Sequence, residues 1–161
     1  MKGSGVLLVL PLLVGAGAFA EDYKGPLPTK ADIPYLLHAS DLVSTEVVQA
    51  SQENQKKSAV YTISGAASSA RTPLAEPIFI MQTKQLDPAT LELWRFEVKN
   101  GQRMLELSAG RRGKLNSGPF HLSVTKIGDH LYRIEVQDML ENGEYSLSAT
   151  GSNIAFCFEI F

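Results

Sequence analysis

The sequence predicts an all-β fold, a sandwich of about seven or eight antiparallel strands preceded by an extended N-terminal arm. From Ser58 onward, short runs of alternating apolar and polar residues recur at intervals of about ten residues, with turn residues between them. Such runs match the two-residue period of a strand and not the period of an amphipathic helix. The preceding segment shows no sustained period and is broken by Pro26, Pro28 and Pro34.

The first twenty residues predict a leader for export. Lys2 precedes an apolar run, Val6 to Leu13, and Ala18 to Ala20 place small residues at the positions that a signal peptidase reads. The run is shorter than the ~20 residues that a membrane-spanning helix needs. We therefore expect residues 1–20 to be a signal peptide, Glu21 to begin the mature chain, and the mature chain not to span a membrane.

Charge and cysteine content narrow the classes of partner and compartment. Removal of Lys2 lowers the 15 basic residues to 14 against 17 acidic ones, so the mature chain carries a formal charge of −3. This balance argues against a nucleic-acid binder. The one cysteine, Cys157, cannot form an intramolecular disulfide, and no Asn-x-Ser/Thr sequon occurs. These features favour a bacterial exported protein, periplasmic or released to the outside.

Residues 21–57 form the expected arm. Within it we expect a short helix from Ser44 to about Gln52, with Ser44 as its N-cap. The arm also carries apolar side chains that need burial, among them Ile33, Tyr35, Leu36 and Leu37. Two interpretations are open: packing against the arm's own domain, which is favoured because large apolar patches rarely stay exposed, or contact with a partner.

The β-sandwich domain is expected over residues 58–161, with eight strands. Each expected strand is a short alternating run bounded by Gly, Pro, Asn, Asp or Ser. Gly65 to Pro77, rich in small residues and proline, reads as a connecting loop. The expected strands are Ala59 to Ser64, Ile78 to Lys84, Glu92 to Lys99, Gln102 to Leu107, Phe120 to Lys126, Leu131 to Gln137, Glu144 to Ala149 and Ile154 to Phe161.

The turn Asn100-Gly101 predicts the first hairpin and its register. Asn-Gly favours a two-residue turn, because both residues readily adopt the positive φ that this turn requires. A two-residue turn here sets Phe96 opposite Leu105 and Trp94 opposite Leu107. Apolar side chains then share one face of both strands, as a half-buried hairpin demands.

Two further hairpins follow from the same reasoning. Between Ile127 and His130, a three-residue loop with Gly128 in the left-handed conformation pairs Leu122 with Ile134. It also pairs Phe120 with Val136 and Val124 with Tyr132. The four-residue loop Thr150 to Asn153 pairs Tyr145 with Phe158 and Leu147 with Phe156, and it places Cys157 on the opposite face.

The segment Leu140-Glu141-Asn142-Gly143-Glu144-Tyr145 resembles the tyrosine corner of immunoglobulin-like Greek-key sandwiches. In that corner a tyrosine hydroxyl bonds back to the backbone a few residues upstream. The resemblance implies an immunoglobulin-like Greek-key sandwich in which Leu140, Gly143 and Tyr145 build the corner. The chain departs from antibody domains in lacking their paired cysteines, and the corner implies no activity.

No catalytic or metal-binding motif appears in the mature chain. It has no G-x-S-x-G, H-E-x-x-H, EF-hand or phosphate-binding glycine loop. We interpret His38, His121 and His130 as solvated side chains, because a metal site needs three or four converging ligands. Trp94 is expected on the core face and not on an exposed sugar-binding platform. We therefore expect no enzyme activity, no cofactor and no metal.

Arg111, Arg112 and Lys114 place three cations in one glycine-containing connection. A solvated loop is the favoured interpretation; the alternative is contact with an anion or with a partner's acidic patch.

Taken together, these features favour an exported, non-catalytic binding or accessory module. Its partner would be an unidentified protein or a component of the cell envelope, and not a nucleic acid. Two alternatives are a small secreted hydrolase using carboxylates, and a structural subunit that adds its N-terminal arm to a neighbour's sheet edge.

Overall fold

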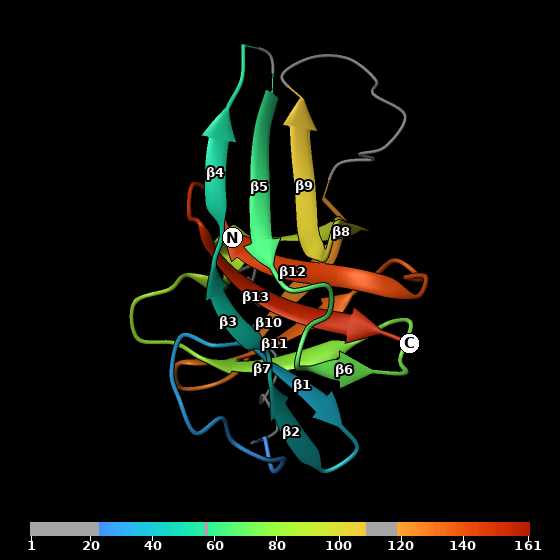
Figure 1. Cartoon of the computed structure of the whole chain (residues 1–161). Coiled ribbons are helices and arrows are strands. Elements are labelled where there is room, and N and C mark those ends of the chain that lie inside the picture. Colours follow the sequence, from blue (N-terminus) through green and yellow to red (C-terminus); the bar gives the residue numbers. More distant parts are fainter. Residues whose placement is uncertain (1–22, 57, 109–118) are drawn as a thin grey trace, which may run out of the picture.

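The computed structural model describes residues 23–56, 58–108 and 119–161, and these residues form an all-β, sandwich-like fold of antiparallel sheets (Figure 1). A single-turn 3₁₀ helix, η1 (Pro88–Thr90), precedes β8. The strands are β1 (Tyr35–His38), β2 (Asp41–Ser44), β3 (Glu46–Gln49), β4 (Ser51–Asn54), β5 (Ser58–Ser64), β6 (Arg71–Thr72), β7 (Ile78–Gln82), β8 (Leu91–Lys99), β9 (Gln102–Ser108), β10 (Leu122–Gly128), β11 (Leu131–Val136), β12 (Gly143–Ala149) and β13 (Ile154–Ile160).

The smaller sheet has five strands in the order β10-β11-β7-β1-β2, all antiparallel. The larger sheet runs β3-β13-β12-β8-β9-β5-β4, and β6 adds to β13 in parallel. Strands from the two ends of the sequence therefore meet in both sheets.

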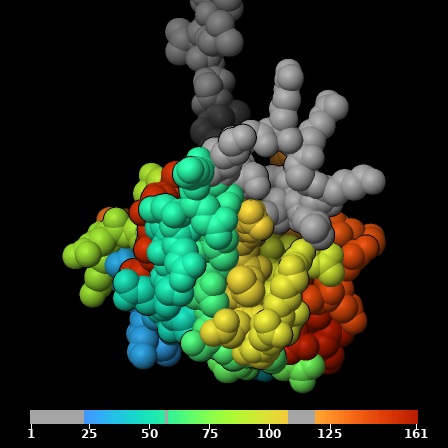
Figure 2. Space-filling model, turned by 45° about the horizontal axis from the view of Figure 1, so that its top comes forward, coloured from blue at the N-terminus to red at the C-terminus, as the bar shows by residue number. Residues whose placement is uncertain are grey.

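The larger sheet curls until its two ends meet on one chain segment. β3 pairs with β13 and β4 pairs with β5, yet only Ala50 separates β3 from β4. The Ala50 amide donates to the Asn153 carbonyl at 2.8 Å, which continues the pairing across this position. The segment from Glu46 to Asn54 thus closes a small barrel, whose outer face over β4, β5 and β9 is seen in Figure 2.

β8, β12 and β13 form a middle layer with a core on each face. Odd-numbered residues of β12 face the smaller sheet, and its even-numbered residues face the barrel interior. Phe158 shows how the sheets meet, since its ring packs edge-on against Phe79 of β7 with centroids 5.1 Å apart. A second core fills the barrel and includes Ile63, Phe96 and Leu105.

All eight expected strands are confirmed, and every end lies within two residues of its expected position. The expected loop from Gly65 to Pro77 contains the two-residue strand β6. The described part of the expected arm supplies four strands, β1 to β4, which the sequence analysis did not predict as strands. Because β4 on one side of residue 57 pairs with β5 on the other, the arm belongs to the sheets.

The helix expected from Ser44 to about Gln52 was wrong. These residues form the end of β2, then β3 and the start of β4, and the Ser44 hydroxyl donates to the Thr45 carbonyl instead of capping a helix. The pairing of this segment with β13 and β5 outweighs its local preference. Across the described residues, no helix has the length and hydropathy to cross a membrane.

Two of the three expected registers are confirmed. The Asn100-Gly101 hairpin pairs Glu97 with Met104 and Val98 with Arg103, the expected register. The last hairpin pairs Tyr145 with Phe158 and Leu147 with Phe156, and Cys157 faces the barrel core as expected.

The register expected around Gly128 was wrong by two positions. Leu122 pairs with Val136 and Val124 pairs with Ile134. The cause is a bulge between Lys126 and Gly128, directly before a tighter turn at Asp129-His130 in which His130 has a φ of 52°. A simple two-residue turn would set the apolar residues of β10 opposite polar residues of β11. The bulge shifts the pairing by one position, so the apolar residues of both strands still point to the core.

The segment compared with a tyrosine corner has the hydrogen bond that such a corner makes. The Tyr145 hydroxyl donates to the Glu141 carbonyl at 2.8 Å. Leu140 is buried in the core between the sheets. At Gly143 a Cβ atom would lie 3.3 Å from the Arg95 guanidinium, which in turn binds the Glu141 carboxylate and the Asn142 carbonyl.

Candidate functional site

The barrel interior divides into a polar end and a hollow end. Inward positions alternate along each strand, so β9 contributes Arg103, Leu105 and Leu107 in succession. Arg103 lies at the polar end, with two glutamates and a serine. Leu107 lies at the other end, beside a pocket that it helps to line.

Arg103 is the centre of the polar end, and only 2% of its side chain is exposed. Its Nη1 and Nη2 donate to the two carboxylate oxygens of Glu46, each at 3.0 Å. Nε donates to the Gly65 carbonyl at 3.0 Å, and Nη2 also donates to the Ser64 carbonyl at 3.1 Å. The guanidinium is thus held by a bidentate ion pair and by the start of the loop after β5.

Ser68 and Glu144 complete the cluster. Arg103 Nη1 donates to the Ser68 hydroxyl at 2.8 Å, and that hydroxyl donates to Glu144 Oε2 at 2.5 Å. The Ser68 amide also donates to both oxygens of Glu144. Arg103 Nη1 lies 3.8 Å from Glu144 Oε2.

The pKa values of the two glutamates are shifted in opposite directions. Burial opposes ionisation of Glu46, but hydrogen bonds from Arg103 and the Ser69 amide outweigh it and hold its pKa below the ordinary value. For Glu144, burial outweighs the hydrogen bonds from Ser68 and raises the pKa. Divergent carboxyl pairs occur in hydrolases. Here, however, both carboxylates are hydrogen-bonded, Glu46 to Arg103 and Glu144 to Ser68, and neither glutamate lines the pocket at the other end of the barrel. The cluster therefore closes one end of the barrel as a structural unit.

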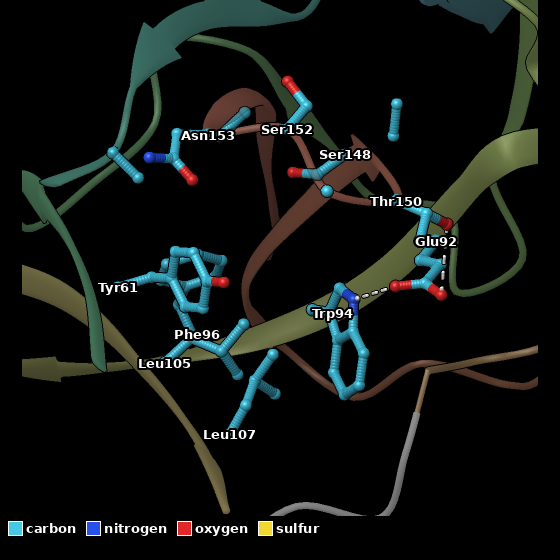
Figure 3. A pocket seen from close by; sticks show the side chains of 14 residues that line it. Tyr61, Glu92, Trp94, Phe96, Leu105, Leu107, Ser148, Thr150, Ser152 and Asn153 are labelled. Carbon is cyan, nitrogen blue, oxygen red and sulfur yellow. Dashed lines mark hydrogen bonds between the residues drawn. The ribbon is translucent and has the colours of Figure 1, made fainter. Parts of the chain in front are cut away.

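The other end of the barrel holds a pocket of about 130 Å³ (Figure 3). Its walls come from β5, β8, β9 and the β12–β13 hairpin. The apolar part is formed by Ala50, Tyr61, Trp94, Phe96, Leu105, Leu107 and Ala155, and the polar part by Glu92, Ser148, Thr150, Ser152 and Asn153.

Small side chains create this hollow. Ala50, Ser148 and Ala155 occupy inward positions at the same end of the barrel as Trp94. Larger residues in these rows would fill the space, as they do in the middle of the barrel. Figure 3 shows Tyr61 and Phe96 on one side of the opening and Trp94 on the other.

Trp94 and Glu92 are fixed relative to one another. The indole Nε1 donates to Glu92 Oε2 at 3.3 Å, and the Thr150 hydroxyl shares its single hydrogen between the Thr90 carbonyl at 3.1 Å and Glu92 Oε1 at 3.4 Å. Both side chains come from inward positions of β8 and are half-buried. The arrangement joins an aromatic wall to a carboxylate within one small pocket, which is typical of a binding site.

The candidate residues from the sequence do not gather at this pocket. Tyr35 and Leu36 are 6% and 1% exposed, so other residues of the chain cover them, in line with the favoured interpretation that the arm packs against its own domain. Ile33 and Leu37 are half-buried. Gly143 and Tyr145 lie in the first part of β12, and Leu140 lies just before that strand. Residues 1–20, Arg111, Arg112 and Lys114 lie outside the described residues.

The histidines do not converge. His121 Nδ1 lies 3.0 Å from Asp138 Oδ2, and His130 Nε2 lies 3.6 Å from Asp129 Oδ1, both in exposed pairs. His38 is half-buried, and its Nε2 has no hydrogen-bond partner among the described residues. No group of three or more potential metal ligands occurs in the described part of the chain.

Sequence reasoning missed both the polar cluster and the pocket. It placed Trp94 on the core face, where it lies, but treated that face as filled. The alternation of the strands does predict that the side chains of Ser148 and Ala155 face the same interior as those of Phe96 and Leu105. Small residues at these inward positions could have indicated unfilled space.

The chain was compared with protein-family models, curated proteins and solved structures, and none of them matches. Inference about what this chain does therefore rests on its own residues, above all those of the barrel interior.

Proposed function

We propose that this chain is an exported, non-catalytic binding module that holds a small molecule in the pocket of its barrel. The pocket carries the proposal: it combines three aromatic side chains, two leucines and a few polar groups in a volume of about 130 Å³. Small-molecule sites are usually concave, mostly apolar and furnished with a few placed polar groups. The space suits a head group or one small ring, and a larger ligand would extend beyond it.

Binding is favoured over catalysis because of which groups line the pocket. Among the described residues, Glu92 is the one carboxylate that lines the pocket, Tyr61 is the one other lining side chain with a group used in proton transfer, and no His, Cys or Lys lines it. The divergent glutamates Glu46 and Glu144 lie at the polar end, engaged with Arg103 and Ser68. A hydrolytic mechanism would need a second catalytic group next to the ligand.

Export is the second part of the proposal, and the sequence of residues 1–20 supports it. In the periplasm or outside the cell, such a module would meet its ligand or an envelope component directly. The test is mass spectrometry of the N-terminus after expression of the full chain in a bacterial host. A mature protein that begins at Glu21 in the periplasmic fraction supports export, and retention of Met1 in the cytoplasm contradicts it.

Ligand-detected NMR tests the binding function. The chain beginning at Glu21 contains every residue that the structure describes, and it is screened against a mixture of neutral, cationic and anionic fragments. Ser148→Leu fills the pocket. Ser123→Leu makes the same change at a half-buried position of β10, away from the pocket.

The proposal expects one or more fragments to bind the unmodified chain and Ser123→Leu, and to lose binding to Ser148→Leu. If no fragment binds, or if Ser148→Leu binds as well as the unmodified chain, the pocket is not a ligand site. Circular dichroism on each variant establishes that the loss does not come from unfolding.

A further inference from the structure

Glu92 is the one charged side chain that lines the pocket among the described residues. Its carboxylate accepts a hydrogen bond from the neutral Trp94 indole and a weaker, shared one from the Thr150 hydroxyl, whose shorter bond goes to the Thr90 carbonyl. No Lys, Arg or His of the described chain forms an ion pair with it. The pocket thus presents a negative charge whose partners in the fold are dipoles and not a cation.

Aromatic faces surround the same space. Trp94, Tyr61 and Phe96 come from β8 and β5, and all three line the pocket (Figure 3). The face of an aromatic ring carries negative electrostatic potential and attracts cations, tryptophan most strongly. An anionic ligand would be repelled by both the carboxylate and these faces. A neutral ligand could donate a hydrogen bond to Glu92 but would leave its charge uncompensated.

We propose that the ligand group bound in this pocket is a small organic cation, an ammonium head group with alkyl substituents. Its alkyl groups contact Trp94, Tyr61 and the leucines, and its positive charge lies near the carboxylate of Glu92. The Ser152 hydroxyl accepts from the Ile154 amide and keeps its own hydrogen for a polar group attached to the cation, whereas the Ser148 hydroxyl bonds that of Ser146. This inference rests on the proposed function, because it names the ligand class of the same pocket.

The test compares choline with its neutral carbon isostere, 3,3-dimethylbutan-1-ol. The two probes have the same shape and differ in charge. Trp94 is the single tryptophan of the chain and lines this pocket, so fluorescence excited selectively at tryptophan reports on the pocket. Titrations are run at constant ionic strength on the unmodified chain, on Glu92→Gln and on the control Glu97→Gln. The control removes one carboxylate from the same strand outside the pocket.

We expect choline to change the fluorescence in a saturable way, with 3,3-dimethylbutan-1-ol binding about tenfold more weakly or worse. Glu92→Gln should weaken choline binding about tenfold, whereas Glu97→Gln should leave it unchanged. Neither variant should alter binding of the neutral isostere. A fourth variant, Tyr61→Leu, keeps the apolar wall but removes one ring, and it should weaken choline more than the isostere.

Other outcomes overturn the inference in distinguishable ways. If the isostere binds as tightly as choline, or if Glu92→Gln has no effect, the pocket selects for apolar shape and not for charge. Tighter binding of glucose than of choline would assign the pocket to a neutral polyol. If choline fails while the fragment screen still finds ligands that Ser148→Leu abolishes, the cation assignment falls and the binding function stands. If neither assay finds a ligand, both fall.

Discussion

Replacement of Arg103 by methionine should be among the most damaging single changes in this domain. Methionine keeps most of the length and the apolar stem but removes a guanidinium that binds Glu46, Ser68 and two loop carbonyls. Glu46 and Glu144 would then share the closed end of the barrel without their cation. Two like charges in a buried site repel each other and lack solvation.

The expected magnitude follows from burial. Removing one partner of a buried ion pair costs about 3–5 kcal/mol. Glu46 retains 21% exposure and can recruit some water, which favours the lower figure. A loss of about 3 kcal/mol is a large part of the 5–15 kcal/mol that stabilises a typical domain. With a urea m-value of about 1.5 kcal/mol/M, the unfolding midpoint falls by about 2 M.

Urea unfolding followed by Trp94 fluorescence and by far-ultraviolet circular dichroism measures this loss. Lys99→Met is the matched control, because Lys99 forms an exposed pair with Glu97, and its midpoint should match that of the unmodified chain. The triple variant Arg103→Met, Glu46→Gln, Glu144→Gln removes the orphaned charges, so it should be more stable than Arg103→Met alone. A loss below about 1 kcal/mol for Arg103→Met, or a triple variant less stable than the single one, would refute the reasoning.

Four further predictions concern single groups. The folded-state pKa of Glu46 is lowered, so its contribution to stability is present above the ordinary value of 4.5 and is lost as pH falls through the folded value; Glu46→Gln should flatten the acid side of the stability profile. The folded-state pKa of Glu144 is raised above the same value, so this group costs stability as pH rises above 4.5, and Glu144→Gln should reduce that loss. Burial raises the pKa of Cys157 to about 12 against the opposing effect of Arg103, so a thiol reagent should fail to react in native buffer and react fully in denaturant; fast native reaction would contradict the burial. Tyr145→Phe removes the hydrogen bond to Glu141 and should cost about 1 kcal/mol in urea unfolding, whereas Tyr132→Phe, whose hydroxyl bonds no described residue, should cost less; equal losses would show that the corner bond adds nothing.

The strands from Ser58 onward were predictable because their information is local. Asn100-Gly101 sets its own register, and the four-residue loop before Ile154 sets that of the last hairpin. The register near Gly128 was predicted wrongly because that prediction, too, used only the residues next to the turn. A bulge and a longer loop both preserve the apolar face, so the pattern of apolar residues alone does not decide between them.

The segment from Glu46 to Asn54, which closes the barrel, was not predicted as strand because β13, the partner of its first half, is distant in sequence. Glu46 occupies an inward position of β3, where a charged residue argues against burial until Arg103 is known to lie beside it. Val48 and Ala50 continue the same inward row. Helix and strand both fit so short a segment, and its pairing with β13 and β5 decided the outcome.

The pocket was missed because a core face was equated with a filled core. The sequence placed Trp94 correctly, yet a hollow depends on the residues opposite, and these come from β5, β9 and the β12–β13 hairpin. Only the closure of the barrel brings Ala50 and Ala155 to the end where Trp94 lies. The leader and the cation run around Arg111 remain predictions from sequence.

A nitrogen–proton correlation spectrum recorded during a choline titration tests the central claim most directly. The single indole of Trp94 gives one well-separated signal, and its N–H binds Glu92. The account predicts that this signal and the amides of residues 148–153 move together and saturate, while the amides of β10 stay fixed. Saturating shifts confined to residues outside the pocket, or no shifts with this or any other small ligand, would contradict it.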